Sequence, residues 1–198
     1  MKNFIIIFKS RFLAEKKIII FSFFISMLIS FANGQSIPAT ASQYDFYEHM
    51  IGYNSPDELA TLFFNAALKK DSLTKYYSPI EVFMYLIENS EVKDKEKAYQ
   101  ETYFLFRKFE ESRREYITAL LDHFYAEKMD SSNTVIDTIE YKIEDIPGQN
   151  GRFKSADIKI RFTSNQSKYS IQLDDCGQIK GKWFIMTPFI LWLGKQEE

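Results

Sequence analysis

Residues 156–162 read Ala-Asp-Ile-Lys-Ile-Arg-Phe, with apolar side chains at every second position and charged side chains between them. Because successive side chains of an extended chain point to opposite faces, this alternation predicts a half-buried β-strand. The same period of two recurs at residues 135–143 and 169–173. Residues 147–151 (PGQNG) and 164–167 (SNQS) are typical turn sequences. The strands are therefore expected to follow one another as an antiparallel meander.

Residues 174–183, DDCGQIKGKW, join the third of these strands to a fourth that begins at Trp183. Lys180 and Gly181 can form the tight turn, because glycine readily takes the positive φ that such turns need. Simple alternation puts Cys176 on the face opposite Leu173, without a neighbouring histidine to activate it as a nucleophile. Adjacent acids and a cysteine point to alternate faces of a strand, so we expect neither a metal nor another cofactor here.

The first half of the domain has helical spacing instead. Residues 55–58, Ser-Pro-Asp-Glu, are a helix start with a capping hydroxyl, a proline at the first helical position and acids in the first turn. Residues 78–81 repeat this signal. Residues 94–129 are helical again, but residues 110–115 (EESRRE) are wholly polar, so either one long helix bends there or two helices meet. We interpret the polar run as a solvated helix face. Helices followed by strands predict an α+β domain with about four antiparallel strands.

The N-terminus has the parts of a secretory signal peptide. Five of the first 17 residues are basic, residues 18–32 carry no charge, and Ala32-Asn33-Gly34 supplies small residues before Gln35. The apolar run is short for a bilayer span, which needs roughly 20 residues. We expect cleavage between Gly34 and Gln35 and a periplasmic or secreted protein. The alternative is an uncleaved anchor, which would place the protein at a membrane.

Composition excludes some classes of protein. The chain has 25 Lys and Arg and 27 Asp and Glu, so removing the five basic residues and one acid of residues 1–34 leaves 20 and 26, a net charge of −6. This balance disfavours a nucleic-acid partner, which requires clustered positive charge. The single cysteine cannot form an internal disulfide. We expect a flexible lead-in at residues 35–54, one domain at 55–193 and a tail at 194–198.

The C-terminal segment is unusually apolar. Trp183 to Met186 and Phe189 to Leu193 are separated only by Thr187 and Pro188, and the proline interrupts any single long strand. We expect residues 189–193 either to fold back as a lid on a pocket or to cover a second copy of the sheet. A large exposed apolar patch would mark an interface.

Two segments resemble nuclear transport factor 2-like domains, a superfamily with a cystatin-like cone. Residues 55–72, SPDELATLFFNAALKKDS, resemble the first helix of these domains, and residues 179–185, IKGKWFI, resemble the hairpin near their end. The likeness also fits secreted members from Bacteroidetes-type bacteria. The resemblance implies a curved antiparallel sheet wrapped round helices, with an apolar cavity lined here by Phe63, Tyr141, Tyr169 and Trp183. This fold serves enzymes, binding modules and assembly domains, so it does not by itself give a function.

Two acids are candidates for proton transfer. Simple alternation puts Asp137 on the face of Ile139 and Tyr141, and Asp175 on the face of Leu173. A carboxylate beside apolar groups has a raised pKa and can exchange protons, and Tyr141 or Tyr169 could then donate a hydrogen bond to a developing oxyanion. Both acids also lie near strand ends, where a side chain reaches water without any function.

These observations support an exported ligand-binding or assembly module without enzymatic activity. Its expected partner is an apolar small molecule or another protein, with a homodimer through the sheet as one form of assembly. The alternative is a cofactor-independent enzyme that uses Asp137 or Asp175 with a tyrosine for proton transfer. An enzyme needs an acid in reach of the bound molecule, whereas a binding module needs only a complementary surface.

Overall fold

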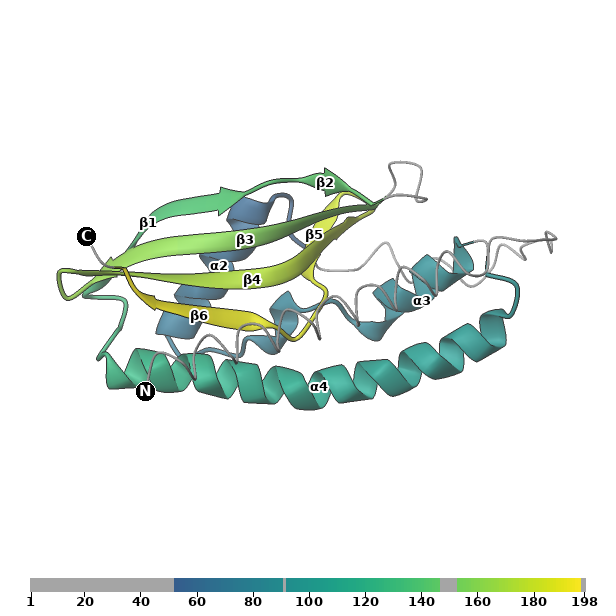
Figure 1. The fold of residues 1–198 in the computed structure, drawn as a ribbon, viewed down its shortest axis with the longest axis horizontal. Helices are drawn as coiled ribbons and strands as arrows, with labels where there is room; N and C mark the ends of the chain where they lie inside the picture. Colours follow the sequence, from purple (N-terminus) through teal and green to yellow (C-terminus); the bar gives the residue numbers. More distant parts are fainter. Residues whose placement is uncertain (1–51, 91, 147–152, 197–198) are drawn as a thin grey trace, which may run out of the picture.

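The computed structural model describes residues 52–90, 92–146 and 153–196, and it confirms the α+β class. Helices come first in this part of the chain and an antiparallel sheet follows them (Figure 1). The helical elements are α2 (Pro56–Leu68), the short 3-10 helix η2 (Thr74–Tyr76), α3 (Ile80–Glu88) and α4 (Lys95–Ala126). The strands are β1 (Thr134–Tyr141), β2 (Glu144–Asp145), β3 (Phe153–Ser164), β4 (Ser167–Ile179), β5 (Lys182–Ile185) and β6 (Ile190–Lys195).

The sheet is built on the long hairpin of β3 and β4. β1 and the short β2 pair with the outer edge of β3, and β5 and β6 pair with successive halves of the outer edge of β4. Residues 190–193 therefore lie in a strand of the sheet and do not fold over it as a lid. After the interruption at Pro188 the chain pairs with β4 again, and the resulting strand continues to Lys195.

A β-bulge shifts the faces of β4. Ile158 pairs with Leu173 but Ala156 pairs with Cys176, so Asp174 and Asp175 together oppose a single residue of β3, Asp157. Asp175 has a φ of 49°, and its N–H donates to Oδ1 of Asp157 at 2.8 Å. The extra residue turns Cys176 inward, so Cys176 joins the same core cluster as Leu173. The expectations that Cys176 opposes Leu173 and that Asp175 shares the face of Leu173 are wrong, because both assumed unbroken alternation.

A second bulge has the same effect in β1. Ile136 pairs with Phe162 and Thr138 pairs with Arg161, which leaves Asp137 as the extra residue. Ile136 and Ile139 both pack against the core although they are three positions apart. Asp137 is exposed and accepts a hydrogen bond from the Thr163 hydroxyl at 2.8 Å. The expectation that Asp137 shares a face with Ile139 is therefore wrong.

Helix α2 begins as its sequence predicts and places the core against the sheet. Ser55 is the N-cap, its hydroxyl accepts from the N–H of Glu58 at 3.1 Å, and Pro56 occupies the first turn. The helix buries Leu59, Phe63 and Phe64 completely. Their partners in the main core cluster are inward residues of the central strands: Ile158, Ile160, Phe162, Ile171 and Leu173.

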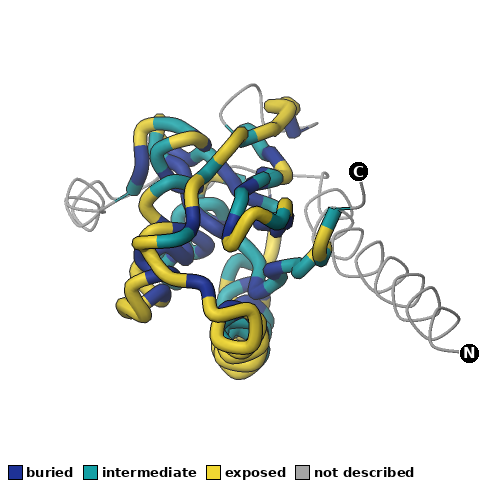
Figure 2. The backbone as a smooth tube through the Cα atoms, turned by 90° about the vertical axis from the view of Figure 1, so that its left-hand side faces the viewer, coloured by how far each residue is buried: buried dark blue, intermediate teal, exposed yellow. Residues whose placement is uncertain are grey.

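Residues 94–129 contain one helix rather than two. α4 runs without interruption for 32 residues, about 48 Å at the α-helical rise. It lies along the β6 side of the sheet, and its N-terminal half continues beyond the sheet beside α3 (Figure 1). Seen end-on in Figure 2, α4 exposes its outer side to solvent. Its fully buried residues lie toward its two ends: Ala98, Thr102, Leu120 and Phe124.

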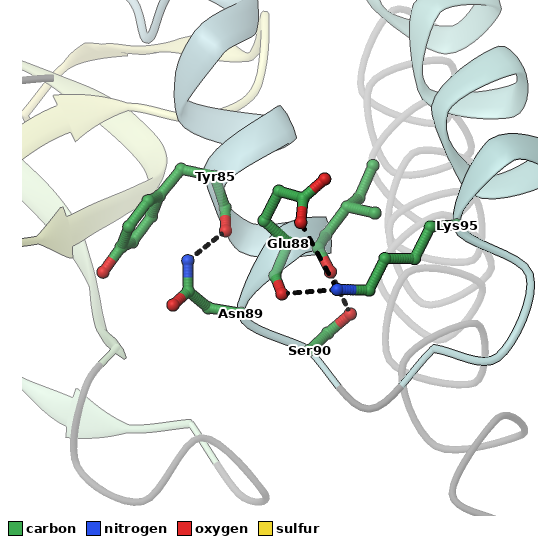
Figure 3. Close-up of polar contacts among 6 residues, drawn as sticks. Tyr85, Glu88, Asn89, Ser90 and Lys95 are labelled. Atoms are coloured by element: carbon green, nitrogen blue, oxygen red, sulfur yellow. Dashed lines mark hydrogen bonds and ion pairs between the residues drawn. The ribbon is translucent and has the colours of Figure 1, made fainter. Parts of the chain in front are cut away.

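Polar side chains close the turn between α3 and α4 (Figure 3). The Asn89 amide donates to the carbonyl of Tyr85 at 2.8 Å, and the Ser90 hydroxyl donates to the carbonyl of Ile87 at 2.7 Å. The Lys95 ammonium reaches back from the first turn of α4 to the carbonyl of Glu88 at 2.7 Å and lies 3.4 Å from its carboxylate. These side-chain bonds add to the backbone bonds at the end of α3, where the N–H of Asn89 donates to the Tyr85 carbonyl and the N–H of Ser90 donates to the Ile87 carbonyl.

We expect Lys95→Met to loosen this turn, because it removes the ammonium and keeps most of the apolar stem. The half-buried bond to the Glu88 carbonyl is worth about 1 kcal/mol. Amide hydrogen exchange of residues 85–90 should therefore speed up. Lys97→Met is the matched control, because the Lys97 ammonium lies 3.9 Å from Glu101 in an exposed pair, and such pairs contribute little. Equal exchange in the two variants would contradict this account.

We also expect Asp157→Ala to destabilise the domain by about 1 kcal/mol, because the bulge then loses the acceptor for its N–H. Asp145→Ala is the control, since Asp145 lies in exposed β2 and its side chain makes no hydrogen bond within the described residues. Chemical denaturation gives both free energies of unfolding. A loss no larger for Asp157 than for Asp145 would show that the carboxylate does not support the bulge.

Candidate functional site

Three of the four aromatic residues predicted to line a cavity are packed inside the core. Phe63, Tyr169 and Trp183 are 0%, 5% and 2% exposed and belong to one cluster. The Phe63 ring meets the Tyr76 ring edge-on at 5.6 Å between centroids, and the Tyr169 ring stacks on Phe162 at 5.7 Å. These contacts give the three side chains a structural role in the core.

Tyr141 lies apart from that cluster, at the edge strand β1. It is 38% exposed, and its hydroxyl donates to Oδ2 of Asp57 at 2.5 Å. The hydrogen bond to Asp57 raises the pKa of the Tyr141 phenol. Asp57 is in the first turn of α2, where a carboxylate also interacts favourably with the helix dipole. The contact ties the sheet edge to the start of α2.

The hydroxyl of Tyr169 is also engaged. It donates to Oε2 of Glu127 at 2.9 Å, just beyond the C-terminus of α4. Burial is the first cause of the raised pKa of Tyr169, and the bond to Glu127 adds to it. The two predicted tyrosines therefore use their hydroxyls to join elements of the fold. The structure does not bring Asp137 or Asp175 together with these tyrosines. Each acid is an irregular residue of a bulge, so neither lies on the strand face that simple alternation predicts for it.

A different polar group lies between α4 and the turn before α3. Tyr77 follows η2, is 3% exposed, and forms a parallel bridge with Ile185 on the outer edge of β5. The guanidinium carbon of Arg113, from the middle of α4, lies 4.4 Å from the centre of the Tyr77 ring. The same carbon lies 5.6 Å from the centre of the Phe106 ring. Arg113 is thus flanked by two aromatic side chains, an arrangement that favours a cation.

Several polar atoms here have no hydrogen-bond partner within the described part of the chain. They are the hydroxyl of Tyr77, the hydroxyl of the neighbouring Ser78, which is 1% exposed, and Nε of Arg113. No carboxylate of the described residues lies within ion-pair distance of Arg113. Since buried polar groups in native proteins almost always have partners, each of these atoms requires an explanation.

The protonation states at this place follow from burial. Desolvation raises the pKa of Tyr77 well above its ordinary value, against the opposing effect of Arg113, so the phenol remains a hydrogen-bond donor at neutral pH. Burial lowers the pKa of Arg113, but a guanidinium starts so high that it stays charged. The Tyr77–Arg113 pair therefore presents one positive charge and several donors.

Two more aromatic side chains follow, one on α4 and one in the loop before β6. Tyr116 lies one turn after Arg113 on α4, and its ring meets Phe189 edge-on at 5.4 Å. Phe189 precedes β6 in the loop that follows β5. We call Tyr77, Ser78, Phe106, Arg113, Tyr116 and Phe189 the α4 site.

Cys176 is close to Tyr77 but does not add reactivity. It is fully buried, and burial raises the pKa of its thiol well above the ordinary value, with Asp157 and Asp175 adding to the shift. A protonated, inaccessible thiol is a poor nucleophile and a poor metal ligand. Within the described residues no three His, Cys, Asp or Glu side chains are grouped as a metal site.

The interpretation of residues 110–115 as a solvated face missed this site. Most of the run is exposed, but Arg113 is half-buried. The signal was present in the spacing, because Arg113 is seven residues after Phe106 and seven before Leu120, which puts all three on one stripe of the helix. A charged residue that continues an apolar stripe can be found by that count.

Comparisons with known proteins identify no relative. No family model matches the chain, and no curated protein or solved structure gives a significant match. The resemblance of residues 55–72 and 179–185 to nuclear transport factor 2-like domains therefore stays a proposal, although the α+β fold with its curved sheet is consistent with it.

Because its hydroxyl has no partner within the described residues, we expect Tyr77→Phe to stabilise the domain without ligand by about 1 kcal/mol, as an unsatisfied buried group is removed. Tyr169→Phe should do the opposite by a similar amount, because that hydroxyl bonds to Glu127 at 2.9 Å. Urea denaturation of both variants makes the comparison. A loss of stability in Tyr77→Phe equal to that in Tyr169→Phe would show that the Tyr77 hydroxyl is satisfied by the fold.

Proposed function

We propose that this chain is an exported ligand-binding module, without enzymatic activity, that binds an apolar small molecule at the α4 site. The observation that carries the proposal is the buried Tyr77 hydroxyl, which has no hydrogen-bond partner within the described residues. Nε of Arg113 also has none there, and the guanidinium carbon lies 4.4 Å from the centre of the Tyr77 ring. A fold that leaves such donors without acceptors loses stability. A ligand that supplies the acceptors would satisfy these donors and recover that free energy.

The packing of α4 supports the same place. Along this described helix no residue between Thr102 and Leu120 is fully buried, although the residues at both limits are. The apolar side chains in that interval include Phe106 and Tyr116, which are half-buried. The middle of α4 therefore has apolar surface that the fold itself covers only in part. An apolar ligand body packed there would remove more of this surface from water.

The enzyme alternative has less support. Asp137 is exposed on β1, and β1 and β5 are opposite edges of the path β1-β3-β4-β5. The α4 site adjoins β5 through the bridge between Tyr77 and Ile185. A general acid or base must contact the bound molecule, and Asp137 is placed too far across the sheet to do so there. Asp175 is part of the β4 bulge, and its backbone N–H donates to the Asp157 carboxylate, which gives this residue a structural role.

Export and assembly belong to the same proposal. The signal sequence expected at residues 1–34 and the lead-in that follows it lie outside the described residues, apart from residues 52–54. Among the residues that the structure describes, no helix is long and apolar enough to cross a membrane. Mass spectrometry of the exported protein should give a chain that begins at Gln35.

A homodimer through the sheet would use the exposed edge of β1, where Val135 is 68% exposed.

A thermal-shift screen of the full chain with apolar small molecules tests the binding proposal. We expect compounds that raise the melting temperature of the native protein to lose most of this effect in Tyr77→Phe and Ser78→Ala. Asp137→Asn, at the far edge of the sheet, is the matched control and should leave every shift unchanged. Shifts that depend on Asp137 and not on Tyr77, or any turnover of a compound abolished by Asp137→Asn, would favour the enzyme alternative instead.

A further inference from the structure

The α4 site also indicates what kind of molecule it binds. We infer that the ligand is an apolar monocarboxylic acid whose carboxylate is held by Arg113 and Tyr77. This inference rests on the proposed function, because it names the ligand class of the same site. Two observations carry it. Nε of Arg113 and the hydroxyl of Tyr77 have no hydrogen-bond partner in the part of the chain that the structure describes, and the guanidinium carbon lies 4.4 Å from the centre of the Tyr77 ring.

The charge at this position favours an anionic ligand. Arg113 is half-buried and positively charged, and the described residues supply no carboxylate within ion-pair distance. Partly buried charges in proteins are normally paired, since removal from water is costly without an opposite charge. An anionic ligand would give this guanidinium a direct ion-pair partner, which a neutral ligand would not supply.

The arrangement of rings around the guanidinium favours a planar anion. The aromatic rings of Tyr77 and Phe106 flank the guanidinium, with their centres 4.4 and 5.6 Å from its carbon. Stacking uses the faces of a guanidinium and leaves its edges, where the N–H groups lie, for a coplanar acceptor. A carboxylate is planar and has two oxygens spaced to accept a pair of those N–H groups. The Tyr77 hydroxyl, on the ring under Arg113, supplies one more donor to the same group.

The acids near Arg113 favour a ligand with a single negative charge. Arg113 is the cation that stacks on Tyr77, and Glu110 is close enough to act on its pKa. Glu115 acts in the same way on Tyr116, one turn further along α4. These two acids disfavour a second negative charge at the site. A phosphate or a dicarboxylate would meet repulsion from them and would find one guanidinium to neutralise it.

Aromatic side chains are available for the rest of the ligand. The Phe106 ring centre lies 5.6 Å from the guanidinium carbon, and one turn further along α4 the Tyr116 ring lies 5.4 Å from that of Phe189. Such surface suits an alkyl or aryl chain that continues from the carboxylate. The combination of one cation, one phenol and several aromatic rings distinguishes a fatty or aromatic acid from a sugar or a nucleotide.

The test uses the full chain, with octanoate as the carboxylate probe and octanamide as its neutral match. The ¹⁵Nε resonance of Arg113, assigned by its loss in Arg113→Gln, should shift on titration with octanoate. The affinity for octanoate should fall about tenfold or more in Arg113→Gln, since a charge-assisted bond is lost. Arg113→Lys, which keeps the charge and loses the fork, should fall between the native protein and Arg113→Gln.

The matched control is Arg114→Gln. Arg114 is the next residue on α4, it is exposed, and its replacement changes the net charge of the chain by the same amount. Octanoate affinity should be unchanged in this variant. An equal loss in the Arg113 and Arg114 variants would reduce the effect to overall charge and overturn the inference.

The remaining outcomes separate this inference from the proposed function. Octanamide binding as tightly as octanoate would overturn the carboxylate assignment, and so would tighter binding of inorganic phosphate. A native protein that binds no octanoate, while other compounds give shifts that depend on Tyr77, would overturn the ligand class and leave the binding module standing. Failure of octanoate and of every compound in the screen would overturn both.

Discussion

The bulge in which Asp174 and Asp175 oppose Asp157 is the constraint on which the rest of the structure depends. It lets β4 pair with β6 before the bulge and with β5 after it, while β3 continues on the other edge. The loop between β5 and β6 is fastened to the bulge itself, since the N–H of Met186 donates to the Asp175 carbonyl and the N–H of Asp174 donates to the Phe189 carbonyl. Without the extra residue, β4 after the bulge would turn its opposite face to the core.

The α4 site follows from the same geometry. Cys176, the first inward residue after the bulge, pairs with Ile185 of β5. Ile185 in turn bridges Tyr77, and its carbonyl accepts from the N–H of Ser78 at 2.9 Å. The bulge therefore fixes the edge on which the turn before α3 rests, and that turn brings the Tyr77 ring under Arg113. A local irregularity of one strand thus determines where an arginine on a distant helix finds its aromatic neighbours.

Sequence patterns predicted the elements well and the faces of two strands poorly, for a physical reason. Alternation and caps are local, so the strands, the start of α2 at Ser55 and the break at Pro188 could all be predicted from neighbouring residues. A bulge depends on the partner strand as well, and one extra residue reverses every face beyond it. Asp137 and Asp175 were assigned to apolar faces because each is itself the irregular residue. The candidate site was harder to predict. Tyr77, Arg113 and Phe189 come from three separate segments of the chain, and residue spacing within a segment does not show how separate segments pack.

At Arg113, the proposed binding role would compete with stability. An apolar residue there would continue the stripe from Phe106 to Leu120 and would pack α4 more firmly against the turn before α3. The arginine instead leaves the middle of a 32-residue helix without a fully buried residue. α4 is nevertheless held at both ends, by Ala98 and Thr102 beside α3 and by Leu120 and Phe124 on the sheet side. Because α4 is anchored at both ends, its middle tolerates a guanidinium that has no ion-pair partner among the described residues. The proposed ligand would link α4 to the turn before α3 through Arg113 and Tyr77.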